Sequence, residues 1–277
     1  TTTAPTARKS PGRTVKMTME PIQIVATKAG QGYRTEAFSA EELFFRGFKA
    51  QKKGQCKAAL APYRRLLKFF AKSPFGAATH YNLALCLQRV NRFAEAAKHF
   101  AAAAGAVAKP AEQILALGAA GVNYAEAKQW RKSAQQFATL VARKDLTNPQ
   151  RLEAQTRLGF AWFKAGNFSK AMSNLRETLA IYRKVRQLER LPTLFYVSMA
   201  QYYIAATYHA KFTESPIRLP VQRMMQDMEE KATWMYKAQK GYWRVVKLKN
   251  HFWAMAAVFQ VGNCYWEYRK AMLAAPI

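Results

Sequence analysis

Residues 121–137 read GVNYAEAKQWRKSAQQF, and residues 159–175 read GFAWFKAGNFSKAMSNL. Both stretches begin with a small residue, and they share a turn position at +7, an aromatic residue at +9, a small residue at +12 and a large apolar residue at +16. Residues 47–63 and 84–100 follow the same offsets, except that the first of them has Cys at +9. The starting positions 47, 84, 121 and 159 recur every 37 or 38 residues. A fixed period in this range predicts an array of helical hairpins.

These offsets resemble the tetratricopeptide repeat (TPR), a hairpin of two helices, A and B, whose small residues let the helices pack closely. The usual repeat is about 34 residues long, so the copies here are longer by three or four residues. The resemblance implies an all-α fold: a right-handed superhelical solenoid of TPR-like helix-turn-helix repeats with a long-helix C-terminal cap. Because such repeats are scaffolds with many different partners, the fold alone does not identify a function.

Composition and chain breakers divide the sequence into three parts. Residues 1–38 are rich in Thr, Pro, Lys and Gly, so we expect an extended or disordered N-terminal arm, with at most one short strand. Residues 39–190 hold four repeats, at about 40–73, 77–108, 111–147 and 149–188, with helices expected over 40–53, 55–72, 77–90, 92–107, 111–127, 129–143, 149–165 and 167–188. Residues 191–277 predict an enlarged, atypical repeat plus a capping helix, with helices over 193–213, 221–249 and 252–273.

The chain is strongly basic, with 44 Lys and Arg residues against 16 Asp and Glu and a net charge of +28. Such a charge favours contact with polyanions: anionic lipid, lipopolysaccharide, acidic protein or nucleic acid. A general adaptation of the surface to an unusual milieu is the alternative explanation. We expect the basic surface to include Lys52, Lys53, Arg64, Arg65, Lys68, Arg183, Lys184, Arg186, Arg244, Lys247 and Lys249.

Motifs for catalysis and metal binding are missing from the sequence. The three cysteines have no CxxC spacing, the four histidines have no partner at metal or triad spacing, and there is no HExxH, GxSxG or P-loop. His209 is expected to be a satisfied core or surface group. The sequence contains no run of about 18 apolar residues, so it does not predict a membrane span. We therefore predict a non-enzymatic protein without cofactor or metal.

The concave face of a TPR array is lined by its A helices. By offset, this face includes Phe44, Phe48, Gln51, Tyr81, Leu85, Gln88, Val122, Phe160 and Phe163. The face is unusually apolar, which favours a groove for an extended apolar peptide or a helix. The alternatives are that the N-terminal arm or the 221–249 helix covers it, or that a second copy of the chain does, since large apolar patches are rare on soluble monomers.

The C-terminal third carries a second resemblance, through Gln201-Tyr202-Tyr203, Arg218-Leu219-Pro220 and residues 253–276. It is similar to secreted TPR proteins of Gram-negative cell envelopes, of the gliding-motility or outer-membrane assembly type. This implies a periplasmic or envelope location, with a cytoplasmic one as the alternative. The function predicted is a scaffold or adaptor that binds a protein or peptide in its concave groove. The alternatives are an RNA-binding helical repeat and a filament or shell subunit that self-assembles through its arm.

Overall fold

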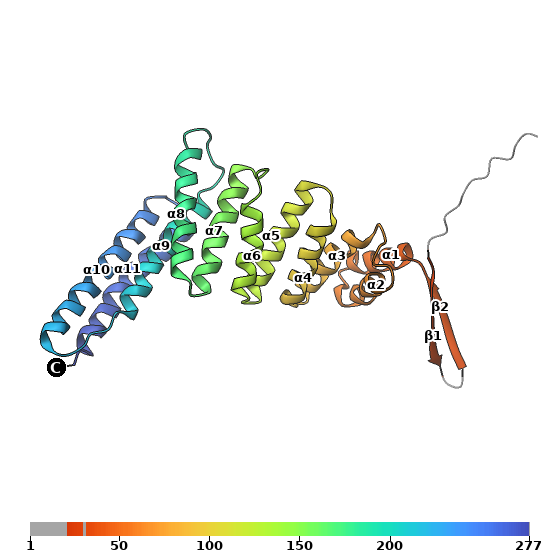
Figure 1. Cartoon of the computed structure of the whole chain (residues 1–277), viewed down its shortest axis with the longest axis horizontal. Coiled ribbons are helices and arrows are strands. Elements are labelled where there is room, and N and C mark those ends of the chain that lie inside the picture. Colours follow the sequence, from red (N-terminus) through yellow and green to blue (C-terminus); the bar gives the residue numbers. More distant parts are fainter. Residues whose placement is uncertain (1–20, 30–31, 277) are drawn as a thin grey trace, which may run out of the picture.

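The structure is a computed structural model that describes residues 21–29 and 32–276. In this part of the chain two strands precede eleven helices (Figure 1). The strands are β1 (Gln23–Ala29) and β2 (Gly32–Phe38). The helices of the repeats are α1 (Ala40–Lys52), α2 (Cys56–Phe69), α3 (Gly76–Arg89), α4 (Phe93–Ala106), α5 (Pro110–Glu126), α6 (Trp130–Val141), α7 (Asn148–Lys164) and α8 (Phe168–Val185). The C-terminal helices are α9 (Phe195–Glu214), α10 (Val221–Val246) and α11 (His251–Leu273).

The helices form one elongated row, with α1 near one end and α10 and α11 at the other (Figure 1). Each of the first eight helices packs against its neighbours in the sequence, α9 packs on both α7 and α8, and α10 and α11 pack on α9. The predicted helical-repeat solenoid is confirmed. The ends of the eight repeat helices differ from the predicted ranges by at most three residues.

The turn position of every repeat has a left-handed backbone. Its φ is +75° at Gly54, +60° at Asn91, +57° at Lys128 and +76° at Gly166. Glycine adopts this conformation without steric cost and Asn tolerates it, which explains why three of the four copies have one of them there. The periodicity of the sequence therefore fixes the turn even at Lys128, a residue that does not itself favour it.

The first and last positions of the repeat pattern contact each other across the hairpin. A Cβ placed on Gly47 would lie 2.6 Å from the ring of Tyr63, and one on Gly121 would lie 2.7 Å from the ring of Phe137. In the fourth repeat a Cβ on Gly159 would lie 2.6 Å from Leu175. The side chains of the helix-B residues are buried, so the absence of a Cβ on helix A is what allows the two helices to approach this closely.

The N-terminal arm differs from the prediction. The sequence predicts an extended or disordered segment with at most one strand, but β1 and β2 form an antiparallel hairpin in which Gln23 pairs with Phe38 and Ala29 with Gly32. The β-branched and aromatic residues of this segment favour strands, which a prediction from composition alone underestimates. Phe38 is buried and packs with Leu43, Leu66 and Phe70, which anchors the hairpin to the first repeat. Residues 1–20 of the predicted arm lie outside the described residues.

Candidate functional site: a basic and aromatic groove on α8, α9 and α10

A groove with a volume of about 1020 Å³ lies where α8, α9 and α10 meet. It is larger than the apolar hollows beside Phe69, of about 440 Å³, and beside Tyr81, of about 460 Å³. Helices α8 and α10 each pack on α9. The groove is lined by Phe168, Ser169, Met172, Ser173, Arg176, Glu177, Ala180 and Arg183 of α8, Thr207, Tyr208 and Lys211 of α9, and Trp234 and Lys237 of α10.

The side chains of α8 reach the groove because they share one face of that helix. Phe168, Met172, Arg176 and Ala180 follow one another at intervals of four residues, and Arg183 continues the same face. Apolar and cationic side chains therefore both line one wall of the groove. Such a wall can contact an apolar side chain and an acidic side chain of the same ligand.

Trp234 fixes the cations of the opposite side. Its ring stacks on Tyr208, with 6.1 Å between the centroids and 20° between the planes. The Nζ atoms of Lys211 and Lys237 lie 4.6 and 4.2 Å from the Trp234 centroid. Arg176 donates a hydrogen bond of 3.0 Å from Nη2 to the Tyr208 hydroxyl. An ammonium group above an aromatic face is attracted by the ring quadrupole, so these contacts hold the cations in place before any ligand binds.

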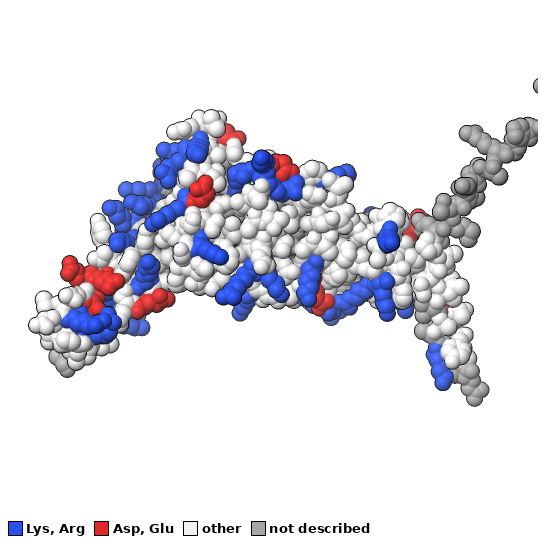
Figure 2. Space-filling view, in the orientation of Figure 1, with Lys and Arg blue, Asp and Glu red and all other residues white. Residues whose placement is uncertain are grey.

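Among the described residues, the groove has more basic than acidic side chains. Four cations (Arg176, Arg183, Lys211 and Lys237) and one acid (Glu177) line it. None of the four forms an ion pair within 4.0 Å among residues 21–29 and 32–276. Figure 2 shows Lys and Arg side chains gathered over the end of the array that holds α8 and α10. A concave surface with one sign of charge concentrates ligands of the opposite sign.

The residues predicted for the concave face fall into separate clusters. Phe44 and Phe48 stack at 6.1 Å, and Phe44 also stacks on Phe75 at 5.1 Å. The side-chain carbonyl of Gln51 accepts a hydrogen bond of 2.7 Å from Tyr63. All of these predicted residues are half-buried inside the first repeats. They therefore contribute to packing between neighbouring helices as well as to the surface.

The rest of the predicted face is also divided. Tyr81 packs on Phe100 at 5.3 Å and lines the 460 Å³ hollow, while Leu85 and Val122 are half-buried and Gln88 is exposed. Phe160 and Phe163 lie 4.8 and 5.0 Å from the ring of Tyr203 of α9. The binding of a partner by these residues stays a prediction.

Neither of the two segments proposed to cover this face does so in the described part of the chain. The hairpin of β1 and β2 projects away from the helices (Figure 1), and α10 packs on α9 and α11. Neither the described part of the arm nor α10 therefore fills the predicted groove. The physical reason is that α10 buries its apolar side against α9 and α11, around Ala238, Tyr242 and Val245.

The predicted basic residues are spread over the molecule, and one of them, Arg183, lines the groove. Several others are engaged locally. Lys52 lies over Phe48 and Lys68 over Phe69, Arg186 lies over Tyr182, Arg64 pairs with Glu95, and Arg65 lies 3.9 Å from Glu36. Lys53, Lys184, Arg244, Lys247 and Lys249 are exposed.

Sequence reasoning missed the contributions of Arg176 and Lys211 to the groove. A signal was present, because α9 and α10 each carry an aromatic residue followed three positions later by lysine, as Tyr208–Lys211 and Trp234–Lys237. Residues three apart lie on one face of a helix. The repetition of this pair on consecutive helices could have pointed to a shared surface.

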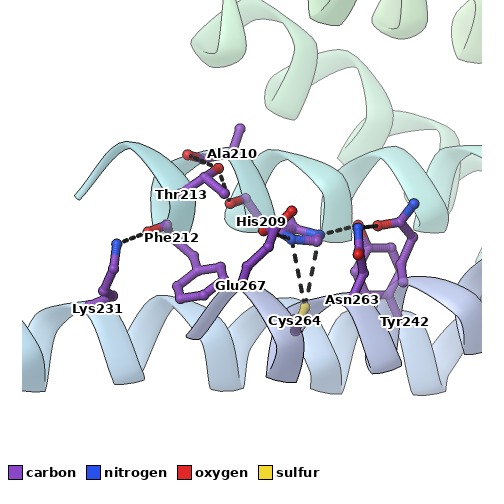
Figure 3. A network of polar contacts seen from close by, with 10 residues as sticks. His209, Ala210, Phe212, Thr213, Lys231, Tyr242, Asn263, Cys264 and Glu267 are labelled. Atoms are coloured by element: carbon purple, nitrogen blue, oxygen red, sulfur yellow. Dashed lines mark hydrogen bonds and ion pairs between the residues drawn. The ribbon is translucent and has the colours of Figure 1, made fainter. Parts of the chain in front are cut away.

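A second polar cluster lies in the core between α9, α10 and α11 (Figure 3). Here His209 contacts the Tyr242 hydroxyl at 3.1 Å through Nδ1 and Glu267 at 2.8 Å through Nε2. The sulfur of Cys264 lies 3.8 Å from Nδ1. The predicted role of His209 as a satisfied core group fits these contacts, whose partners lie 33 to 58 residues away in the sequence.

The combination of Cys264, His209 and Glu267 does not form an activated nucleophile. Cys264 is fully buried, and this burial raises the pKa of its thiol to about 12. A reactive cysteine needs a thiolate and access to its substrate, and Cys264 has neither. The cluster instead joins the three C-terminal helices. In the part of the chain that the structure describes, no group of three or more His, Cys, Asp or Glu residues is arranged to hold a metal ion, and no helix is both long and apolar enough to cross a membrane.

No protein-family model and no curated protein matches the sequence. Several solved structures are similar in fold. TPR-like repeats of a putative kinesin light chain from Podospora anserina are 19% identical, with a TM-score of 0.44 over 72% of this chain and 96% of that one. A TPR protein from Parabacteroides merdae is 14% identical, with a TM-score of 0.47 over 86% and 80%. Residues 41 to the end of MamA from Desulfovibrio magneticus are 12% identical, with a TM-score of 0.42 over 73% and 96%.

All three of these structures are described as TPR proteins or as MamA, and similarity at this level concerns the fold alone. The chain's own geometry defines its class. Four hairpins repeat one turn conformation and, in three of them, one contact of a helix-A glycine with a large helix-B side chain. The chain therefore has the architecture of a TPR-type helical-repeat protein.

Proposed function

We propose that this protein is a non-enzymatic interaction scaffold that binds an acidic segment of a partner protein in the groove formed by α8, α9 and α10. The observation that carries the proposal is a groove lined by four cations that form no ion pair with the described residues, three of which contact Trp234 or Tyr208. Helical-repeat arrays expose extended surfaces suited to binding other proteins. We infer that the basic groove is the part of this array that contacts the partner.

The chemistry of the groove favours a segment that combines acidic and apolar side chains. Carboxylates would approach Arg176, Lys211 and Lys237, while Phe168 and Met172 offer apolar contacts along α8. Charge-assisted contacts across an interface supply specificity and speed of association, and the apolar contacts supply burial.

An acidic protein segment is favoured over single-stranded nucleic acid because of Trp234. Binding of single strands relies on aromatic faces that are free to stack on bases. The Trp234 ring already stacks on Tyr208 and has two lysine ammonium groups within 4.6 Å of its centroid. The ring therefore serves to position two exposed lysine cations that line the groove.

Fluorescence anisotropy with a labelled Asp- and Glu-rich peptide that contains one central leucine tests this proposal. The triple variant Arg176→Gln, Lys211→Gln and Lys237→Gln removes three groove cations. If each partly exposed contact contributes about 0.5–1 kcal/mol, the three together weaken binding roughly 10- to 100-fold. The affinity of the wild-type protein should also fall as salt is added, because salt screens exposed charges.

The matched control is the triple variant Lys53→Gln, Lys57→Gln and Lys98→Gln, which removes the same charge from exposed positions on α2, α4 and the first turn. It should bind the peptide with nearly unchanged affinity. Equal weakening in both triple variants would show that net charge alone attracts the peptide. An RNA oligonucleotide of the same charge that binds more tightly, and loses that affinity in the groove variant, would replace the proposal with the nucleic-acid alternative.

A further inference from the structure

Helix α11 exposes a row of large apolar side chains. The exposed fractions are Phe252 64%, Met255 75%, Phe259 69%, Trp266 51% and Leu273 73%. Together with Gly262 and Arg269, these positions alternate in steps of three and four residues along the whole of α11. Steps of three and four are the spacing of a helix that packs lengthwise against another helix.

At the middle of this row, Gly262 has the position of a helix-A glycine without the usual contact. Gly121, Gly159 and Gly262 are each the twelfth residue of their helix. The first two lie under Phe137 and Leu175 of the following helix. A Cβ on Gly262 would meet no atom within 4 Å in the described part of the chain, apart from its own helix and neighbours. The outer side of α11 therefore has the form of a helix A whose place for an antiparallel second helix is open.

We propose that this place is occupied by α11 of a second copy of the chain, packed antiparallel about a twofold axis. With the axis close to residues 260–261, Phe259 of each copy lies over Gly262 of the other, as Phe137 lies over Gly121 within one repeat. Met255 then meets Trp266 of the other copy. The apolar face is complementary to itself because one operation matches both pairs.

The charge of the face favours a second copy over an acidic partner. No Asp, Glu, Lys or Arg occurs between Phe252 and Trp266, although the chain as a whole carries a net charge of +28. Two copies can therefore meet along this stretch without bringing like charges together, whereas an acidic helix would find cations beyond it, at Arg269 and Lys270, which lie over Trp266. This surface is separate from the groove around Trp234, so the inference does not depend on the proposed function.

The size of the face is also sufficient. Val258 and Tyr265 flank the row and are 49% and 60% exposed. Aromatic side chains bury about 150–250 Å² each when fully covered, so the exposed parts of these seven residues offer roughly 800 Å² per copy. A standard stable interface buries about 800 Å² per partner.

Sedimentation velocity of the full chain over a broad range of concentrations tests the proposal, and we expect a dimer. The Gly262→Leu variant should be monomeric, because a leucine side chain keeps the two helices apart while finding open space in the single copy. Gly105→Leu is the matched control, since Gly105 is exposed on α4 and a Cβ there also meets nothing within 4 Å. This control should remain a dimer, and circular dichroism should show that both variants are as helical as the wild type.

Cross-linking then checks the alignment of the helices. A mixture of the single variants Phe259→Cys and Gly262→Cys, oxidised with diamide, should give a disulfide-linked heterodimer in higher yield than either variant alone. The three native cysteines are buried and should contribute no background. A wild-type chain that is monomeric at every concentration would overturn the proposal, as would a Gly262→Leu variant that is still a dimer.

Discussion

Two alanine substitutions in α5 should change stability in different directions, although they are three residues apart in the same helix. At Gly118 a Cβ meets nothing within 4 Å, whereas at Gly121 it meets two ring carbons of Phe137 at 2.7 Å. Alanine is a better helix former than glycine by about 1 kcal/mol. We therefore expect Gly118→Ala to raise the free energy of unfolding by about 0.5–1 kcal/mol.

At Gly121 the same gain is opposed by overlap. Carbon atoms in contact normally lie about 3.5–4.0 Å apart, so the new methyl group intrudes by roughly 1 Å on a ring that is only 2% exposed. Overpacking of a core costs about 1–3 kcal/mol. Gly121→Ala should therefore be less stable than Gly118→Ala by about 1–3 kcal/mol. Urea unfolding followed by circular dichroism at matched slopes measures this difference, and equal stabilities would refute the close contact between helices A and B that the repeat pattern is built on.

Three further predictions concern buried and half-buried polar groups. The Nδ1 atoms of His80 and His99 lie 2.9 Å apart, and burial lowers both pKa values, that of His99 from 6.5 to about 4. Because the pKa of each histidine is lower in the folded than in the unfolded protein, the neutral histidine pair contributes fully to the free energy of unfolding above pH 6.5. This contribution is lost as the pH falls toward 4. Allowing for partial exposure, the loss is on the order of 1–2 kcal/mol, and a His80→Gln/His99→Gln variant with the same pH dependence would contradict it. Lys231 is buried and donates to the carbonyl oxygens of Phe212 and Ser215 at 2.7 and 2.6 Å, at the end of α9. Replacing it with Met should cost about 2–3 kcal/mol in urea unfolding, whereas a change of under about 0.5 kcal/mol, typical of exposed lysines, would show that these bonds are not important. The native thiols should not react with Ellman's reagent at pH 8 and should all react in denaturant, because every cysteine is buried; fast reaction of the folded protein would exclude this packing.

The repeats could be predicted from the sequence because their decisive contacts are local. Gly121 and Phe137 lie sixteen residues apart inside one hairpin, and the same pair of positions recurs in the other copies. Lys128 shows how much the periodicity predicts, since alignment with Gly54, Asn91 and Gly166 at the other turns places a left-handed turn at a residue that gives no local indication of one.

The groove could not be predicted in the same way, because it depends on how three different helices pack. Arg176 and Tyr208 are 32 residues apart, and Trp234 comes from a third helix outside the regular repeats. Sequence offsets predict which residues share one face of a helix. They do not predict how far apart the faces of two packed helices lie. For the same reason the sequence could not show that Phe160 and Phe163 pack against Tyr203 of α9. The envelope location rests on resemblance alone and stays a prediction that cell fractionation would test.

The central claim is that an acidic segment binds in the groove around Trp234. Photo-cross-linking with an Asp- and Glu-rich peptide that carries a diazirine beside its central leucine, followed by mass spectrometry, tests it most directly. We expect cross-links to Met172, Tyr208 and Trp234, and their loss in the groove triple variant. Cross-links centred on Phe48 and Tyr81 would instead place the ligand on the A helices of the first repeats and contradict the claim.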